Sequence, residues 1–170
     1  MTRFHQVLKV SSITFICILT INVSISQEVN RSQSFPRIGI IADCQYADQP
    51  TRGVRHYRLS NQKLNECVDS LNTFELDHVF HLGDFIDQHY QSFEEVLPII
   101  DRLKAPHTQV LGNHDFSVEE RYKEAVPQIM GLKARYFSMM VKEWKFIILD
   151  GNDVSLYAWP KNSENYKQAS

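Results

Sequence analysis

The sequence predicts an α/β domain in which short parallel strands alternate with helices. Three short apolar runs, at residues 37–42, 78–82 and 108–111, each end in a cluster of polar side chains. After each run, apolar residues recur at the spacing of an amphipathic helix. Strands that alternate with helices in this way indicate a layered α/β domain around a parallel sheet.

The first strand and helix occupy residues 37–74. Residues 37–42 form a continuous, isoleucine-rich run, which is typical of a parallel strand covered on both faces. A charged loop follows at residues 48–58, and then a helix that ends near residue 74. The inward face of this helix is expected to contain Leu64, Val68 and Leu71.

The second strand covers residues 78–82 and leads to a second helix. Ser92 and Glu95 have the spacing of a capping box, in which the two side chains satisfy free backbone donors. The helix is expected to continue to Lys104, with a distortion at Pro98.

The third strand covers residues 108–111 and is followed by a helix and a hairpin. Residues 117–120 have the spacing of a second capping box, which would open a helix that ends near Met130. Two β-prone runs, residues 136–141 and 145–149, are joined by three residues and predict a hairpin.

The composition suits one globular domain and gives no electrostatic reason to bind nucleic acid. The chain has 170 residues, of which 43% are hydrophobic and 22% charged, and its formal net charge is -2. A small phosphate-bearing molecule remains compatible, because a metal ion supplies positive charge locally. The spacing of Cys44 and Cys67 demands no disulfide, and we expect free thiols.

The first 26 residues resemble a secretory signal peptide. A positive start is followed by residues 10–25, which are apolar or small and uncharged, and small residues precede a cleavage site after Ser26. Residues 27–36 are expected to form a linker and residues 37–170 the domain. This predicts a secreted or periplasmic protein that meets the membrane only through its leader. An uncleaved N-terminal anchor is the alternative.

Polar side chains that suit metal binding follow each predicted strand. Asp43 and Gln45 follow the first strand, residues 83–87 (GDFID) the second, and residues 112–115 (GNHD) the third. Because the carboxyl ends of neighbouring parallel strands line one crevice, we expect these clusters to meet in space. Carboxylate, amide and imidazole groups suit manganese, iron, zinc or magnesium. The sequence therefore predicts a metal-dependent hydrolase site.

Two ions that share a bridging carboxylate would account for these residue types. Asp43 and Gln45 are expected to bind one ion, Asn113 the other, and Asp84 both. His114 would then face the substrate as a general acid or as a donor to a phosphoryl oxygen. The alternative is that these side chains only cap the ends of strands.

Together these segments resemble the calcineurin-like metallophosphoesterase superfamily, whose motifs run D-x-H, G-D-x-x-D and G-N-H-D/E. Gln45 stands where most members have histidine. That difference is characteristic of one branch, the manganese-dependent ADP-ribose/CDP-alcohol diphosphatases. Residues 41–48, 57–60 and 145–155 resemble further segments of this branch, so that the similarity extends over about residues 37–157.

The resemblance implies a four-layer α/β/β/α sandwich with two divalent metal ions, manganese in preference to iron, zinc or magnesium. It assigns the metal ligands to Asp43, Gln45, Asp84 and Asn113. His114 and Asp84 would be catalytic, and Asp87 and Asp115 would orient their neighbours. The implied reaction is hydrolysis of a phosphoanhydride bond in a nucleotide diphosphate compound such as ADP-ribose or a CDP-alcohol.

The chain departs from the family pattern after the third motif. Family members take further ligands from histidines in G-H and G-H-x-H segments, and this chain has no histidine after His114. Either the chain is the N-terminal half of the fold and lacks a C-terminal half, which we expect, or it is complete with an open metal site. The alternative functions are a broad phosphomonoesterase or phosphodiesterase, and an inactive fragment that binds a nucleotide or a partner chain.

The charged loop offers candidate substrate-binding residues. Its arginines could hold a diphosphate or a ribose, because a guanidinium group binds phosphate through two hydrogen bonds. Tyr57 could stack on a base. We assign Arg55, Tyr57 and Arg58 to the substrate and include Arg52 in the same basic group. A solvated loop is the alternative for the arginines, and core packing is the alternative for the tyrosine.

Overall fold

A computed structural model describes residues 35–170 of the chain. The predicted leader, residues 1–26, and all but the end of the predicted linker, residues 27–36, lie outside the described residues. Within residues 35–170 no helix is long and apolar enough to cross a membrane.

A three-stranded parallel sheet forms the centre of the fold. Its strands are β1 (Ile38–Ile41), β2 (His78–His81) and β3 (His107–Gln109), in the order β1-β2-β3. The last residues of the strands are level, because Ile41 is opposite His81 and His81 is opposite Gln109. The three predicted strands are therefore confirmed, and the segments that follow them leave the sheet at one edge.

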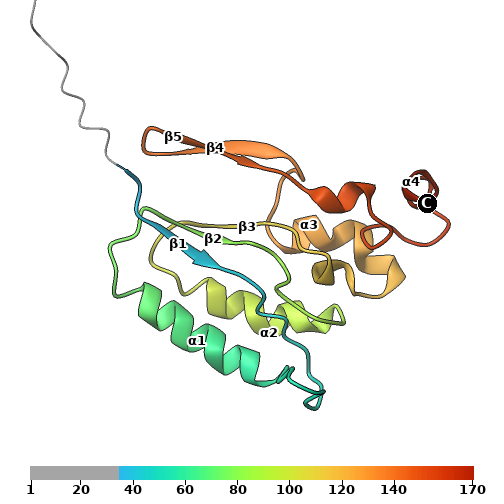
Figure 1. Ribbon diagram of the computed structural model, residues 1–170, viewed down its shortest axis with the longest axis horizontal. Coiled ribbons are helices and arrows are strands. Elements are labelled where there is room, and N and C mark those ends of the chain that lie inside the picture. Colours follow the sequence, from blue (N-terminus) through green and yellow to red (C-terminus); the bar gives the residue numbers. More distant parts are fainter. Residues whose placement is uncertain (1–34) are drawn as a thin grey trace, which may run out of the picture. The chain divides into compact units, whose positions relative to one another are not determined.

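Two helices cover one face of this sheet. They are α1 (Leu59–Leu71) and α2 (Gln91–Ile100), which pack against each other (Figure 1). The main hydrophobic core lies between helices and sheet and includes Val68, Val79 and Val96, none of which has exposed surface. α2 ends at Ile100, earlier than the predicted Lys104. Beyond it, the N–H groups of Arg102 and Leu103 donate to carbonyls three residues earlier, so the chain continues in tighter turns.

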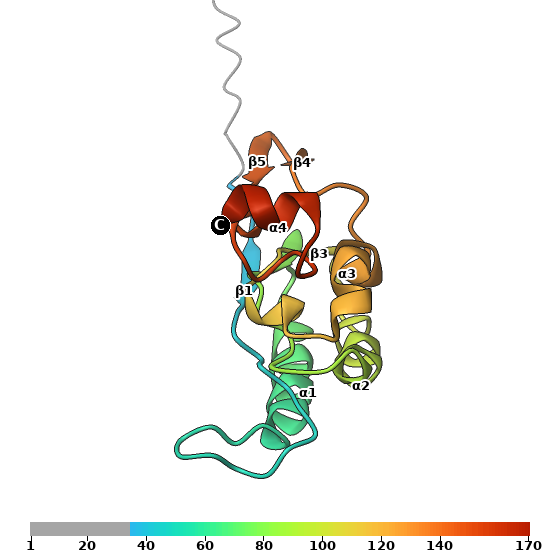
Figure 2. The same ribbon diagram turned by 90° about the vertical axis from the view of Figure 1, so that its right-hand side faces the viewer.

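An antiparallel hairpin covers the other face. β4 (Phe137–Val141) and β5 (Trp144–Ile148) pair as predicted, and Val141 and Ile148 pack on Phe80 of β2. Figure 2 also shows the hairpin and the two helices on opposite sides of the sheet. These are the α, β and β layers of the predicted four-layer sandwich. The outer face of the hairpin, with Met140 and Ile147, is exposed in the described part of the chain.

The segment after β3 differs from the prediction. The single helix expected over residues 117–130 is a 3₁₀ helix, η2 (Glu120–Ala125), followed by the short α3 (Val126–Ile129). Pro127 explains the break, because it lacks the N–H group that an α-helix beginning ten residues earlier would need there. Proline fits the first turn of α3, where no such partner is required. The other described elements are η1 (His114–Phe116), η3 (Gly151–Val154) and α4 (Glu164–Ala169).

Neither predicted capping box forms. α2 begins at Gln91, so Ser92 lies inside the helix and its hydroxyl donates to the carbonyl of Gln88. At the second box, the carboxylate of Glu120 accepts the N–H of Lys161. A local hydrogen bond therefore uses Ser92, and a long-range one uses Glu120, in place of the predicted capping boxes.

Cys44 and Cys67 are free thiols, as predicted. Both pack against the main core, and burial raises the pKa of Cys44 to about 12. A thiol with this pKa stays protonated and serves as an apolar packing group.

His81 couples the stability of the fold to pH. Its side chain is 1% exposed and lies against Phe85, and burial lowers its pKa from 6.5 to about 4. Between these pH values the unfolded chain binds a proton that the folded chain excludes, so the free energy of unfolding decreases as the pH falls through this range. Between pH 7 and pH 4.5, we expect the free energy of unfolding to fall by about 2 kcal/mol less in the His81→Leu variant than in the wild type. Urea unfolding at the two pH values measures this difference.

The comparison between wild type and variant isolates His81 from the other titrating groups. A Val79→Ala variant, which changes a buried side chain of the same strand but no titrating group, serves as the control and should keep the wild-type pH dependence. Equal pH dependence of the wild type and His81→Leu would contradict the assignment of His81 as a neutral, buried group.

Candidate metal centre

The segments that follow the three strands meet at the carboxyl edge of the sheet. The N–H of Asp43 donates to the carbonyl of Gly83 at 3.2 Å, and the N–H of Gln45 donates to the carbonyl of Asp84 at 2.9 Å. The segment after β3 joins them, because the N–H of His114 donates to Oδ1 of Asp84 at 2.8 Å. The structure therefore brings the three sequence clusters together.

Three predicted metal ligands have a left-handed backbone conformation. The φ angle is 55° at Asp43, 46° at Gln45 and 54° at Asp84. This region is uncommon for residues other than glycine, and each instance costs about 1 kcal/mol or more. Such strain persists where the surrounding structure fixes it, and it clusters at functional sites. Here it falls on residues that the sequence assigns to metal binding.

Gly112 allows the third segment to approach Asp84 closely. A Cβ atom at this position would overlap the backbone nitrogen and Oδ1 of Asp84. Glycine is therefore required at position 112 for steric reasons, because any side chain there would displace the carboxylate of Asp84.

Asp115 holds the second and third segments together. Its carboxylate has no exposed surface and accepts four backbone N–H groups at 2.7 to 3.4 Å, those of Asp84, Phe85, Ile86 and Gly112. Burial raises the pKa of Asp115 to about 7, and the backbone donors oppose this rise. These contacts fix the backbone around Asp84.

The side chains of Asp43, Gln45 and Asp84 converge. Nε2 of Gln45 lies 3.5 Å from Oδ1 of Asp43 and 3.5 Å from Oδ2 of Asp84. Two carboxylates from different strands thus face a common point, and a flip of the Gln45 amide would turn its oxygen to the same point. Oxygen donors in this arrangement suit a hard divalent cation such as manganese or magnesium.

The backbone of Asn113 lies at the same edge of the sheet as Asp84. Its two neighbours in the chain, Gly112 and His114, both contact Asp84. Among residues 35–170, no three histidine, cysteine, aspartate or glutamate side chains surround a common ion position. A metal ion held by the described residues would therefore depend on the amide oxygens of Gln45 and Asn113 as well as on the two carboxylates.

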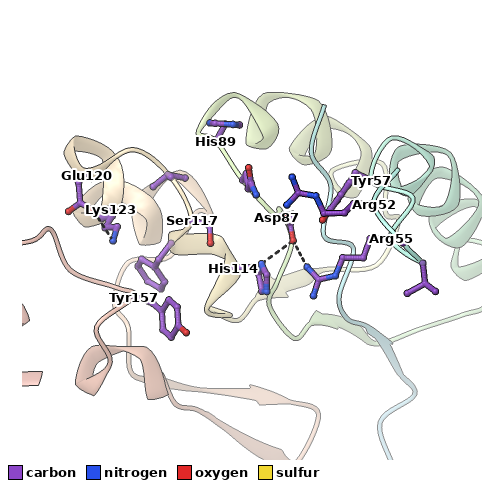
Figure 3. Close-up of a pocket in the computed structure, with 15 residues that line it drawn as sticks. Arg52, Arg55, Tyr57, Asp87, His89, His114, Ser117, Glu120, Lys123 and Tyr157 are labelled. Carbon is purple, nitrogen blue, oxygen red and sulfur yellow. Dashed lines mark hydrogen bonds and ion pairs between the residues drawn. The ribbon is translucent and has the colours of Figure 1, made fainter. Parts of the chain in front are cut away.

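His114 and Arg55 contact the same oxygen of Asp87 (Figure 3). Oδ1 of Asp87 lies 3.1 Å from Nδ1 of His114 and 3.0 Å from the guanidinium group of Arg55. The histidine contact is a close approach rather than an aligned hydrogen bond. The side chain of Asp87 is only 3% exposed, and the guanidinium group of Arg55 compensates its buried charge. Asp87 is therefore placed to orient the ring of His114.

A pocket of about 750 Å³ opens beside His114. Arg55 and Tyr57, two of the residues predicted to bind substrate, line it. Tyr57 is also buried, as core packing would require. Arg58 is not part of the lining, because its Nε lies 2.6 Å from Oδ1 of Asp48. Further residues that line the pocket include Arg52, Lys123 and Tyr157.

The sequence indicates only one of these three additional pocket residues. Arg52 is an arginine in the charged loop for which phosphate binding is predicted, so a role in the pocket can be expected from the sequence. Lys123 and Tyr157 come from segments far along the chain, and neither belongs to a motif. Figure 3 shows both on the side of His114 opposite the two arginines.

Comparisons with known proteins agree with the motifs and the fold. The sequence profile described as calcineurin-like phosphoesterase matches residues 36–165. Two curated relatives are named manganese-dependent ADP-ribose/CDP-alcohol diphosphatase. The one from Arabidopsis thaliana is 30% identical over 75% of this chain, and the one from Homo sapiens is 29% identical over 76%. The chain spans about half the length of these relatives, 46% and 47%.

A solved structure shows the same fold. A dimetal phosphatase from Danio rerio superposes with a TM-score of 0.65 and 24% sequence identity, over 79% of this chain and 51% of that chain. Sequence profile, motif order and fold are thus consistent with one another, and the chain belongs to the calcineurin-like phosphoesterase family.

Proposed function

We propose that the chain is a metal-dependent hydrolase that cleaves the phosphoanhydride bond of nucleotide diphosphate compounds such as ADP-ribose or CDP-alcohols. The observation that carries the proposal is the convergence of Asp43, Gln45 and Asp84 next to His114. The names of the curated relatives support this class of substrate.

The donor set fits two divalent metal ions, with manganese favoured by the names of the relatives. Asp43, Gln45 and Asp84 would hold one ion, and Asp84 with Asn113 the other. When bound, such ions supply positive charge to the oxygens of a phosphoryl group, which the described acidic cluster alone would repel.

His114 is the residue that would handle the proton. Its side chain is 25% exposed and lines the pocket, while Asp87 holds its Nδ1 side. This arrangement leaves Nε2 for the substrate, where a protonated ring donates to the leaving oxygen or to a phosphoryl oxygen. Arg55, on the other side of Asp87, keeps the carboxylate in place.

A panel of three substrates tests the proposal. With Mn²⁺, we expect AMP from ADP-ribose and CMP from CDP-choline to form with higher kcat/KM than nitrophenol from p-nitrophenyl phosphate. The His114→Ala variant should lower kcat by about 100-fold or more for the first two substrates. His107→Ala, at the opposite end of β3 from the site and with a side chain that is also 25% exposed, is the matched control and should keep wild-type rates.

Two outcomes would contradict the proposal, and they differ. If p-nitrophenyl phosphate is the best substrate, the chain is a broad phosphomonoesterase. If the folded wild-type chain binds a nucleotide and turns over none of the three, it is an inactive binding fragment.

A further inference from the structure

Most charged side chains around the pocket are paired with one another. Arg55 contacts Asp87 at 3.0 Å, and Nζ of Lys123 lies 3.3 Å from Oε1 of Glu120. Nδ1 of His89 lies 3.4 Å from Oε1 of Glu119, outside the lining. Arg55 and Lys123 are therefore already compensated before any ligand enters.

Arg52 is the exception. It lines the pocket, its side chain is exposed, and within residues 35–170 it has no hydrogen-bond or ion-pair partner for its guanidinium group. Figure 3 shows it on the same side of His114 as Arg55. The uncompensated positive charge of the pocket is therefore located at Arg52.

A tight turn presents this arginine. The N–H of Arg52 donates to the carbonyl of Arg55 at 3.0 Å, and the N–H of Arg55 donates to the carbonyl of Arg52 at 3.1 Å. Gly53, with a φ of 61°, and Val54 form the tip of the turn. A contact of 3.2 Å between the Thr51 hydroxyl and Nδ1 of His56 braces its base. The turn fixes the backbone of Arg52 relative to Arg55, which is anchored on Asp87.

We propose that Arg52 binds a second phosphate group of the substrate, next to the one that reacts, and so selects diphosphates over single phosphate esters. The inference rests on the proposed function, since the reacting phosphate is placed there by the metal-ligand cluster and His114. A guanidinium group suits this task, because its fork of donors matches two phosphate oxygens. Arg55 is less suited, because a move to the substrate would leave Asp87 with one partner fewer.

Equilibrium binding separates this role from catalysis. ADP and AMP differ by one phosphate, and ADP is supplied as its α,β-methylene analogue, which cannot be hydrolysed. Their dissociation constants are measured with the full chain in Mn²⁺, because the metal-free acidic cluster would repel both nucleotides. We expect Arg52→Gln to weaken ADP binding by about tenfold and AMP binding by less than twofold, because one charge-assisted contact is lost. Arg52→Lys should give an intermediate loss, since it keeps the charge without the fork.

Arg58→Gln is the matched control, because Arg58 lies in the same loop but pairs with Asp48 outside the pocket. It should leave both dissociation constants unchanged. With Mn²⁺, Arg52→Gln should raise KM for ADP-ribose and leave KM for p-nitrophenyl phosphate unchanged.

The results overturn the inference if wild type binds ADP no better than AMP, or if Arg52→Gln weakens both nucleotides equally. The inference and the proposed function fail in different ways. Loss of ADP affinity in Arg52→Gln without hydrolysis of ADP-ribose by the wild type supports phosphate binding and refutes the hydrolase. Hydrolysis of ADP-ribose with the same KM in wild type and Arg52→Gln supports the hydrolase and refutes phosphate binding by Arg52.

Discussion

Replacing Asp84 with asparagine is expected to lower kcat for ADP-ribose by more than about 100-fold. Asp84 is the one carboxylate that all three segments contact, through Gln45 and through the N–H of His114. Asparagine has the same size but carries no charge, so it weakens the hold on divalent ions. It also tolerates the left-handed φ of 54° found at this position, so the fold should survive.

The control for this variant is Asp69→Asn on the exposed side of α1, which removes one negative charge far from the site. It should keep wild-type kcat, and all three proteins should have the same far-UV circular dichroism spectrum. A folded Asp84→Asn protein with wild-type kcat would refute the role of Asp84.

The Gly112→Ala variant is expected to lose about 2–3 kcal/mol of unfolding free energy together with most of its activity. The added Cβ would overlap the backbone nitrogen and Oδ1 of Asp84. Because one of these atoms is backbone, the clash cannot be relieved by rotating a side chain. The two segments must separate, and Asp115 would then lose part of its contact with both. Urea unfolding and kcat measure the two effects.

Gly151→Ala is the matched control, because a Cβ at that position would meet nothing within 4 Å. Its unfolding free energy should stay within about 0.5 kcal/mol of wild type. Equal stability of Gly112→Ala and Gly151→Ala would show that the segments after β2 and β3 are not packed as closely as described.

The central sheet is predictable from the sequence because each strand belongs to a short run that ends in polar residues. The predicted burial of β1 on both faces is wrong, since Ile40 is 63% exposed, and only β2 is buried throughout. Three apolar runs predict β1, β2 and β3 to within two residues, and the β-prone runs around residue 143 predict the hairpin. In each case the apolar pattern is local.

The helix ends are less predictable, because tertiary contacts compete for the same groups. Glu120 accepts a hydrogen bond from the N–H of Lys161, which lies 41 residues further along the chain. The residues around Glu120 give no indication of this partner. Pro127 does give a local signal: its missing N–H group breaks the helix expected over residues 117–130. Capping spacing favours a helix start, and here the proline and the long-range hydrogen bond outweigh it.

The candidate site likewise has a part that is predictable from the sequence and a part that is not. Asp43, Gln45 and Asp84 are predictable as neighbours, since the ends of parallel strands meet at one edge. The pocket is not, because it depends on which side chains of separate segments face it. Arg55 and Arg58 look equivalent in the sequence, but one contacts Asp87 in the pocket and the other pairs with Asp48.

Calorimetric titration of Mn²⁺ into the metal-free chain, wild type against Asp84→Asn, tests most directly whether the converging carboxylates form a metal site. Saturable binding to the wild type that weakens by at least about tenfold in Asp84→Asn is the predicted result. Superimposable titrations of the two folded proteins would contradict it.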